Sequence, residues 1–275
     1  MKKVLVGVDL NTTYVWLVVR AADLAECIGA QVDLVYVASK KSAEERQRHQ
    51  HTLDGLMEHM EAGLRGASLV CDGNASEVLS EMSRGYDVMV VGPREPAGWK
   101  RLIEKPMAVK VIAGARCPVF IPRTEEPKRA FPRILVGVDL NAEDNDERLT
   151  SAGEWARALG ARIDVAYCEA NPAHRLDEDS ARKAADKRWQ ALRTEQLSTL
   201  RAQMERCIDA AARGEAILSD TMPATGLMNL SKDYDLLMVG TTDVASDSIL
   251  MGSVAVEAVR HAHCDVMTLP SQEVQ

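Results

Sequence analysis

The sequence predicts an α/β protein of two tandem, doubly wound, Rossmann-like domains, each with a parallel sheet of about five strands. Residues 4–10 read Val-Leu-Val-Gly-Val-Asp-Leu, and residues 134–140 read Ile-Leu-Val-Gly-Val-Asp-Leu. A repeat of this spacing has the length of a whole domain rather than of a solenoid unit. Within each copy, short apolar runs alternate with segments of helical periodicity, which implies parallel strands joined by right-handed crossovers.

The first copy defines the order of elements. Val4 to Val8 is an apolar run interrupted only by Gly7, the pattern of a strand buried on both faces. A helical pattern over residues 14–28 follows, and Gly29 is a suitable helix stop. The remaining strands are expected at 32–37, 67–70, 88–91 and 119–121, and the remaining helices at 40–65, 76–84 and 105–113.

The repeat divides the chain into a first domain at 1–122, a linker at 123–132 and a second domain at 133–275. The linker is a charged stretch that contains Pro127 and Pro132. Gly29 and Gly160 are 131 positions apart whereas Tyr86 and Tyr234 are 148 apart, so the second copy has gained 17 residues.

The added residues fall in segment 174–213, which predicts a long inserted helix. If continuous, it would extend about 60 Å at about 1.5 Å per residue. Its start, residues 177–188, is nearly all charged or small, so we expect these turns to overhang the domain as a solvated face. A lid or a partner-docking arm is the alternative.

Composition bounds the location and the partners. The formal net charge of −8 argues against bulk attraction to nucleic acid, so no nucleic-acid partner is expected. No apolar run approaches a membrane span, and the run after Met1-Lys2-Lys3 is too short for a signal peptide. The six cysteines are dispersed and form no CxxC pair, which is typical of reduced thiols. These features predict a cytoplasmic protein without a membrane association.

Several segments together resemble the universal stress protein family in tandem form, over almost the whole chain. Arg133-Ile-Leu-Val-Gly-Val-Asp139 is similar to the family's first strand, and Leu159-Gly160-Ala161 to the end of its first helix. Asp235-Leu-Leu-Met-Val-Gly240 is similar to the fourth strand, which runs into Gly252-Ser253-Val254. The resemblance implies an adenine nucleotide α-hydrolase-like fold and a stress-response or regulatory function.

The resemblance also implies a nucleotide site, which the second copy keeps in part. In ATP-binding members the loop after the fourth strand reads Gly-x2-Gly-x9-Gly-Ser/Thr, so that backbone N–H groups approach the phosphates. Gly240 fits this pattern, but Asp243 replaces the second glycine, and the spacing from there to Gly252 is one residue short. Gly252-Ser253 remains a competent helix start for an anion, although a Ser253 N-cap or a tight turn at Gly252 explains it equally well. The candidate binding residues of this copy are Asp139, Cys168, Gly240, Gly252 and Ser253.

The first copy departs further from the pattern. Lys105-Pro106 replaces Gly-Ser, and the proline removes an N–H that a phosphate would use. We expect a solvated basic loop there and no usual ATP mode. The weaker candidates of this copy are Asp9, Val37 and Gly92. Asp9 ends a buried strand as Asp139 does, where α/β folds place ligands, although either carboxylate can instead cap the following turn.

Catalytic and metal-binding patterns were not found. The sequence contains no Ser–His–Asp order, no P-loop lysine motif and no paired carboxylates of fixed spacing. His49, His51 and His59 lack the companions of a zinc site and are expected to be exposed. We therefore expect no catalytic residues and no metal site.

Two functions follow. The favoured one is a non-enzymatic stress-response or regulatory protein, a binding or adaptor module; the alternative is a C-terminal domain that binds ATP and at most hydrolyses it weakly. By the resemblance, strands 119–121 and 266–269 pair across the two halves, so that one chain forms a pseudo-dimer. A further homodimer, the protein partner and any other cofactor are left open.

Overall fold

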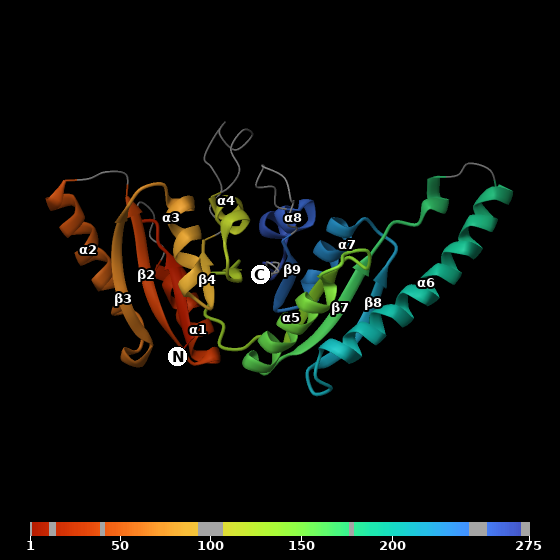
Figure 1. Cartoon of the computed structure of the whole chain (residues 1–275), viewed down its shortest axis with the longest axis horizontal. Helices are drawn as coiled ribbons and strands as arrows, with labels where there is room; N and C mark the ends of the chain where they lie inside the picture. Colours follow the sequence, from red (N-terminus) through yellow and green to blue (C-terminus); the bar gives the residue numbers. More distant parts are fainter. Residues whose placement is uncertain are drawn as a thin grey trace.

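A computed structural model describes residues 2–10, 15–38, 42–92, 107–175, 179–241 and 252–270. Its strands form one ten-stranded sheet in the order β3-β2-β1-β4-β5-β10-β9-β6-β7-β8 (Figure 1). Each half of the chain supplies five adjacent, parallel strands in the same relative order, as the sequence repeat predicts.

Each half alternates strands and helices. The first half comprises β1 (Lys2–Gly7), α1 (Val15–Ile28), β2 (Ala30–Ala38), α2 (Ala43–Met57), β3 (Arg65–Asp72), α3 (Ala75–Met82), β4 (Val88–Val91), α4 (Met107–Gly114) and β5 (Val119–Ile121). The second comprises β6 (Arg133–Val138), α5 (Asn145–Leu159), β7 (Arg162–Cys168), α6 (Asp179–Cys207), β8 (Arg213–Ser219), α7 (Pro223–Leu230), β9 (Leu236–Gly240), α8 (Ser253–His261) and β10 (Asp265–Leu269). Short 3-10 turns lie at Ala62–Leu64, Ser83–Gly85, Pro172–Arg175 and Ser231–Asp233.

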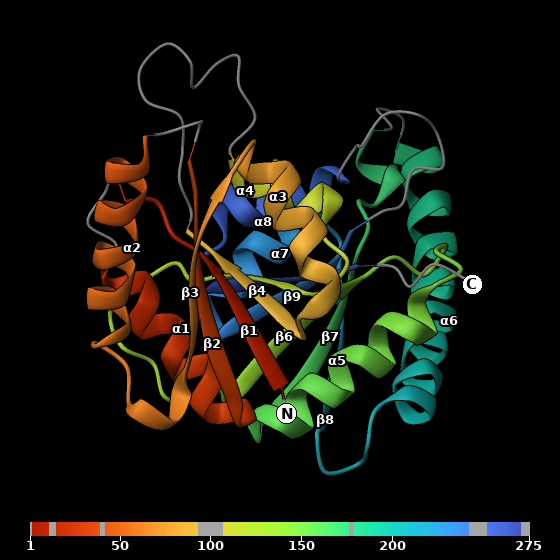
Figure 2. The ribbon, with the colours of Figure 1, turned by 60° about the vertical axis from the view of Figure 1, so that its left-hand side comes forward.

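The helices cover both faces of the sheet (Figure 2). One core cluster contains buried side chains of α1, α2, α5 and α6, and the other contains those of α3, α4, α7 and α8. The central strands are buried on both faces, which explains their continuous apolar sequences. Gly29 and Gly160, each with a φ near +65° (66° and 63°), end α1 and α5 in the left-handed conformation that glycine adopts at low cost.

Two predicted helices are shorter than their sequences suggested. The helix expected over 40–65 ends at Met57. Met60 lies in the turn that follows and packs on the same core, so the apolar spacing in the sequence continues beyond the end of the helix. The inserted helix begins at Asp179 after the 3-10 turn and ends at Cys207. Its 29 residues correspond to about 44 Å rather than the predicted 60 Å.

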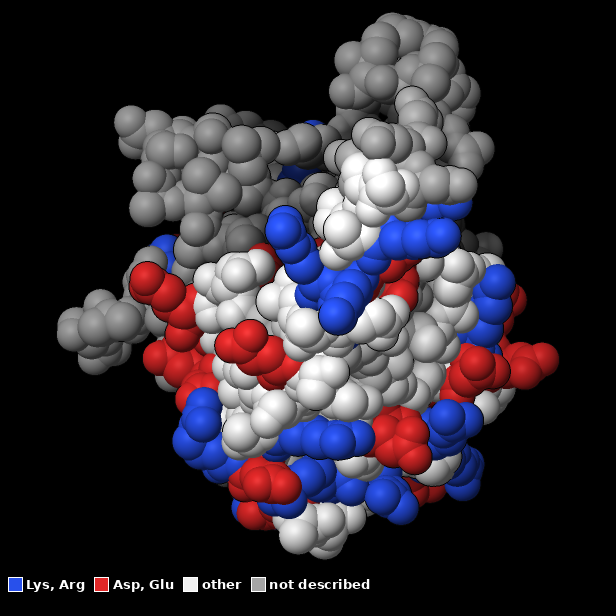
Figure 3. Space-filling view, turned by 90° about the vertical axis from the view of Figure 1, so that its right-hand side faces the viewer, with Lys and Arg blue, Asp and Glu red and all other residues white. Residues whose placement is uncertain are grey.

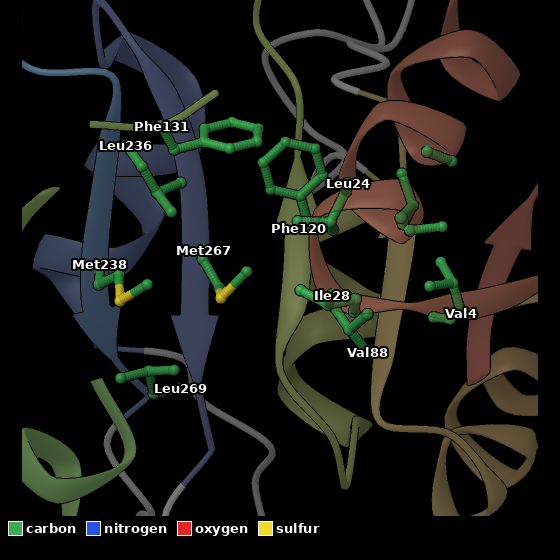
Figure 4. Packing of buried hydrophobic residues seen from close by; sticks show 14 of the residues in the cluster. Val4, Leu24, Ile28, Val88, Phe120, Phe131, Leu236, Met238, Met267 and Leu269 are labelled. Atoms are coloured by element: carbon green, nitrogen blue, oxygen red, sulfur yellow. The ribbon is translucent and has the colours of Figure 1, made fainter. Parts of the chain in front are cut away.

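The halves are joined through their last strands. β5 and β10 pair antiparallel, with Met267 opposite Phe120 and Val266 opposite Ile121, as the sequence analysis expected. Phe120 also packs edge-on against Phe131, with ring centroids 5.9 Å apart, and Met267 lies across the join (Figure 4). One apolar cluster therefore runs from Val4 to Leu269 through both halves.

A buried ion pair lies beside this join. The guanidinium of Arg20 on α1 contacts the carboxylate of Asp265 on β10, and the two side chains are 0% and 2% exposed. The backbone N–H of Arg123 donates to Asp265 Oδ1 at 2.8 Å, and Arg20 also lies 3.4 Å from Asp23. The pair therefore links the first helix, the linker and the last strand.

A membrane-spanning segment was sought among the same residues. None of the helices that the structure describes is both long and apolar enough to cross a bilayer.

Candidate ligand-binding site

A cavity of about 550 Å³ opens at the carboxyl ends of β6, β7 and β9 in the second half. Parallel α/β sheets hold ligands at this edge, and the volume is that of a small-molecule site. All five residues predicted from the second copy line it: Asp139, Cys168, Gly240, Gly252 and Ser253.

Asp139 follows β6 and shapes the rim of the cavity. Its Oδ1 accepts hydrogen bonds from the backbone N–H of Asn141 at 3.0 Å and from Asn141 Nδ2 at 3.1 Å. The side chain of Asn145 donates to the Asp139 carbonyl oxygen. Asp139 therefore forms the turn that was the alternative to a ligand contact, and this exposed residue also lines the cavity.

The inner wall is apolar and closely packed. Cys168 ends β7 and is 4% exposed, and burial raises the pKa of its thiol, so it presents a neutral surface. Gly226 of α7 lets the helix pack closely on Cys168, because a Cβ at this position would lie 2.6 Å from Cys168 Sγ. A Cβ at Gly137 would likewise lie 2.6 Å from Leu227 Cδ1.

The N-terminus of α8 forms another side of the cavity. Gly252 is the N-cap and Ser253 is the first helical residue, so the alternative of a Ser253 N-cap is wrong. The side chain of Ser253 is exposed, and Val254 and Ala255 line the cavity beside it. The first N–H groups of a helix have no intrahelical acceptors and carry its positive end, which favours an anion.

Arg148 on α5 lines the cavity and was not among the residues predicted from the sequence. Its guanidinium lies over Gly240, where a Cβ would come within 2.5 Å of Cζ. Its Nη2 donates to the Thr241 carbonyl oxygen at 3.1 Å and pairs with Asp144 Oδ2 at 2.5 Å. Leu17 occupies the equivalent position beside Gly92 in the first copy, so a change from leucine to arginine between the repeats was the available signal.

Helix α6 holds the opposite rim in place. Gln196 Nε2 donates to Glu169 Oε2 at 2.7 Å, and the Tyr167 hydroxyl donates to the same oxygen at 3.1 Å. Burial, followed by the charge of Glu169, raises the pKa of Tyr167 to about 12. Arg193 Nε and Trp189 Nε1 contact Asp220 Oδ1 at 3.0 and 3.2 Å, just before Met222, which lines the cavity.

The first turns of α6 are solvated, as expected. Lys183, Lys187 and Arg188 are exposed there, and the space-filling view of this side shows Lys and Arg side chains interspersed with Asp and Glu over the face (Figure 3). Asn171 Nδ2 donates to Asp186 Oδ1 at 3.0 Å and ties these turns to the segment after β7. The alternative of a lid or docking arm stays a prediction.

The weaker candidates of the first half lie at the carboxyl ends of their own strands, which run antiparallel to those of the second half. Asp9 follows β1, the half-buried Val37 lies near the end of β2, and Gly92 follows β4. Leu17 Cδ2 would be 3.6 Å from a Cβ on Gly92, so an apolar side chain takes the place that Arg148 has in the second half. The predictions for Lys105-Pro106 and for Asp243 concern residues outside the described ranges.

Histidine and metal chemistry give no further candidate within the described ranges. No group of three or more His, Cys, Asp or Glu side chains there is placed to hold a metal ion. His49, which we expected to be exposed, is half-buried and packs edge-on against Tyr36 with ring centroids 4.7 Å apart. The helix period brought it back to the core side of α2.

Comparison with known proteins adds family evidence to this geometry. The sequence model of the universal stress protein family matches residues 1–123 and again 130–270. No curated protein matched the chain.

Solved structures share the fold over nearly the full length. A universal stress protein from Archaeoglobus fulgidus DSM 4304 is 14% identical with a TM-score of 0.71, covering 99% of this chain and 97% of its own. A putative universal stress protein from Pseudomonas aeruginosa UCBPP-PA14 is 16% identical with a TM-score of 0.65, covering 98% and 93%. A functionally unknown protein from Pseudomonas aeruginosa PAO1 is 17% identical with a TM-score of 0.64 and the same coverage.

Proposed function

The chain belongs to the universal stress protein family in its tandem two-domain form, and from this premise we propose a non-enzymatic regulatory protein that acts through binding. The ligand is a nucleotide, and it occupies the cavity of the second domain. The site of action is the cytoplasm, which the dispersed single cysteines support.

One observation carries the proposal. The five residues that the family resemblance selected from distant parts of the sequence line a single cavity of about 550 Å³. That cavity combines an apolar wall, the N-terminus of α8 and the Arg148 guanidinium, which together suit a flat ring attached to an anionic group.

An adaptor role is the second part of the proposal. The inner face of α6 is anchored through Trp189, Arg193 and Gln196, whereas Lys183 and Lys187 are exposed on its outer face. Because Glu169 both lines the cavity and bonds to α6, a ligand that moves the rim also moves this helix. We propose that α6 presents the state of the cavity to a protein partner.

Calorimetric titration with adenine nucleotides tests the binding function, with Ser253→Asp as the decisive variant. Aspartate in the first turn of α8 favours the helix by about 0.3–1 kcal/mol, so the fold is retained, yet its charge repels an anion at that position. Ala43→Asp is the matched control, since it places the same charge at the exposed first residue of α2, away from the cavity.

The expected result is one nucleotide per chain, with affinity at least tenfold lower in Ser253→Asp and unchanged in Ala43→Asp. Equal binding by the Ser253→Asp variant would exclude this cavity as the site. Absence of heat and of a thermal shift at millimolar nucleotide would overturn the ligand proposal.

A further inference from the structure

We infer that Arg148 makes the cavity of the second domain selective for a nucleotide with a single phosphate over a triphosphate; among the residues that the structure describes, the first domain has Leu17 at the equivalent position. The inference rests on the proposed function and names its ligand class. It follows from where the guanidinium lies, from the charges around it and from the comparison of the two copies.

The position of Arg148 is fixed. The side chain is 11% exposed and is tied to Asp144 one helical turn away and to the carbonyl oxygen of Thr241. It lies against Gly240, where β9 ends, and only a residue without a Cβ leaves room for it there. A ligand therefore meets a preorganised cation at the carboxyl end of β9, where parallel sheets bind ligands.

The charges of the cavity limit how much negative charge a ligand can carry. Among the described residues that line it, Arg148 is the single cation, and Asp139 and Glu169 are carboxylates. The charge of Arg148 is further shared with Asp144. One phosphate group is matched by the guanidinium and the α8 N-terminus, whereas each additional phosphate faces the carboxylates without a second cation.

The rest of the cavity accepts an apolar, flat group. Val138, Met222, Pro223 and Leu227 contribute apolar surface, and Met222 is 56% exposed at the mouth. A ring held on this surface and a phosphate at Arg148 and the α8 N-terminus would occupy the same cavity, as the two parts of a nucleoside monophosphate require.

The first copy supplies an internal control for the role of Arg148. Leu17 is 1% exposed and stands at the equivalent position beside Gly92. The strands, the glycine pairs Gly7/Gly137 and Gly92/Gly240, and the hydrogen bonds of Tyr86 to Asp33 and of Tyr234 to Asp164 are repeated. The Arg148 guanidinium is thus one feature that distinguishes the second site from the first, besides the replacement of Gly252-Ser253 by Lys105-Pro106 in the first copy.

Titration of the full chain with adenosine, AMP, ADP and ATP, each with Mg²⁺, tests the inference. We expect one site per chain and an affinity for AMP at least tenfold higher than for ATP. Arg148→Leu, which copies the first domain, should lower AMP affinity at least tenfold and leave adenosine affinity within about twofold. Arg148→Lys should retain part of the AMP affinity, and Arg201→Leu, at an exposed position of α6, should bind like the unmodified protein.

The outcomes separate this inference from the proposal beneath it. If neither nucleoside nor nucleotide binds, the proposed function fails. If ATP binds as tightly as AMP, or if Arg148→Leu binds AMP normally while Ser253→Asp does not, the proposed function stands and the role of Arg148 is refuted. Arg148→Leu could lose the affinity for adenosine together with that for AMP, while the folded Arg148→Lys variant keeps both. In that case Arg148 shapes the whole cavity rather than selecting the phosphate, and the inference fails.

Discussion

Replacing Asp265 with alanine should destabilise the protein strongly, because it leaves the buried Arg20 guanidinium without its main counter-charge. Arg20 is 0% exposed, and its contacts with Asp23 and with the Lys128 carbonyl oxygen are longer, both at 3.4 Å. The ring of Phe131 lies 5.8 Å from its Cζ. The substitution also removes the acceptor of the Arg123 N–H.

The expected cost follows from burial. Breaking a buried ion pair costs about 3–5 kcal/mol, and the remaining Asp23 places this case near about 3 kcal/mol. For a chain of this size that corresponds to a melting temperature lower by about 6–12 °C. Asp146→Ala is the control, because it breaks an exposed ion pair with Arg206. The side chains of Arg206 and Asp146 are 57% and 46% exposed, so this substitution should cost less than about 1 kcal/mol.

Urea unfolding of a double-mutant cycle with Arg20→Met measures the coupling directly. If the orphaned charge is the cause, the double variant should be more stable than Asp265→Ala alone. A cost of Asp265→Ala below about 1 kcal/mol, or simple additivity with Arg20→Met, would refute the reasoning.

Two further predictions concern the repeated core and the pH dependence of stability. Tyr86→Phe and Tyr234→Phe remove hydroxyl donors to Asp33 and Asp164 at 2.8 and 2.7 Å, and each should cost about 1.5–3 kcal/mol in urea unfolding; costs differing by more than about 1 kcal/mol would contradict equivalent roles in the two copies. Burial raises the pKa of Cys117 and of Cys264 to about 12 from 9.0, so the folded state holds these protons more tightly than the unfolded state does. The stability that the protonated thiols contribute is therefore complete below about pH 9. This stability should be lost as the pH rises from about 9 toward 12, by about 1.4 kcal/mol per thiol and pH unit. A urea midpoint that is equal at pH 8 and pH 10.5 would contradict this, and so would a loss of stability with pH that stays equally steep after Cys117→Ala and Cys264→Ala.

The sequence predicted the fold because its signals are local and occur twice. The apolar run at Val4–Val8, the helix stops at Gly29 and Gly160 and the final strands each recur at the expected place. Helix ends were less accurate, since the apolar spacing through Met60 does not distinguish a helical turn from an irregular one that packs on the same core.

The site was predictable only in part, because its polar contacts join residues far apart in the sequence. Asp139 was predicted because it follows a buried strand, where α/β folds place ligands, and Gly240 because it fits the family's loop pattern. Arg148 was missed because its role depends on the orientation of α5 over β9, and no local pattern marks that. The Glu169–Gln196 bond likewise joins residues that the sequence gives no reason to pair.

The two departures from symmetry explain what joining the copies in one chain permits. In a dimer of identical subunits, any residue at the Arg20 position would recur at its twofold mate. Here the mates of Arg20 and Asp265 are Ser151 and Pro118, so the buried ion pair forms once, and it forms between the halves. The mate of Arg148 is Leu17, so a cation at this position also occurs once. The ion pair uses Arg20 of the first copy, whereas the Arg148 cation lies in the cavity of the second copy. The first copy therefore contributes a charge to the contact between the halves, and the second contributes a charge to the ligand cavity.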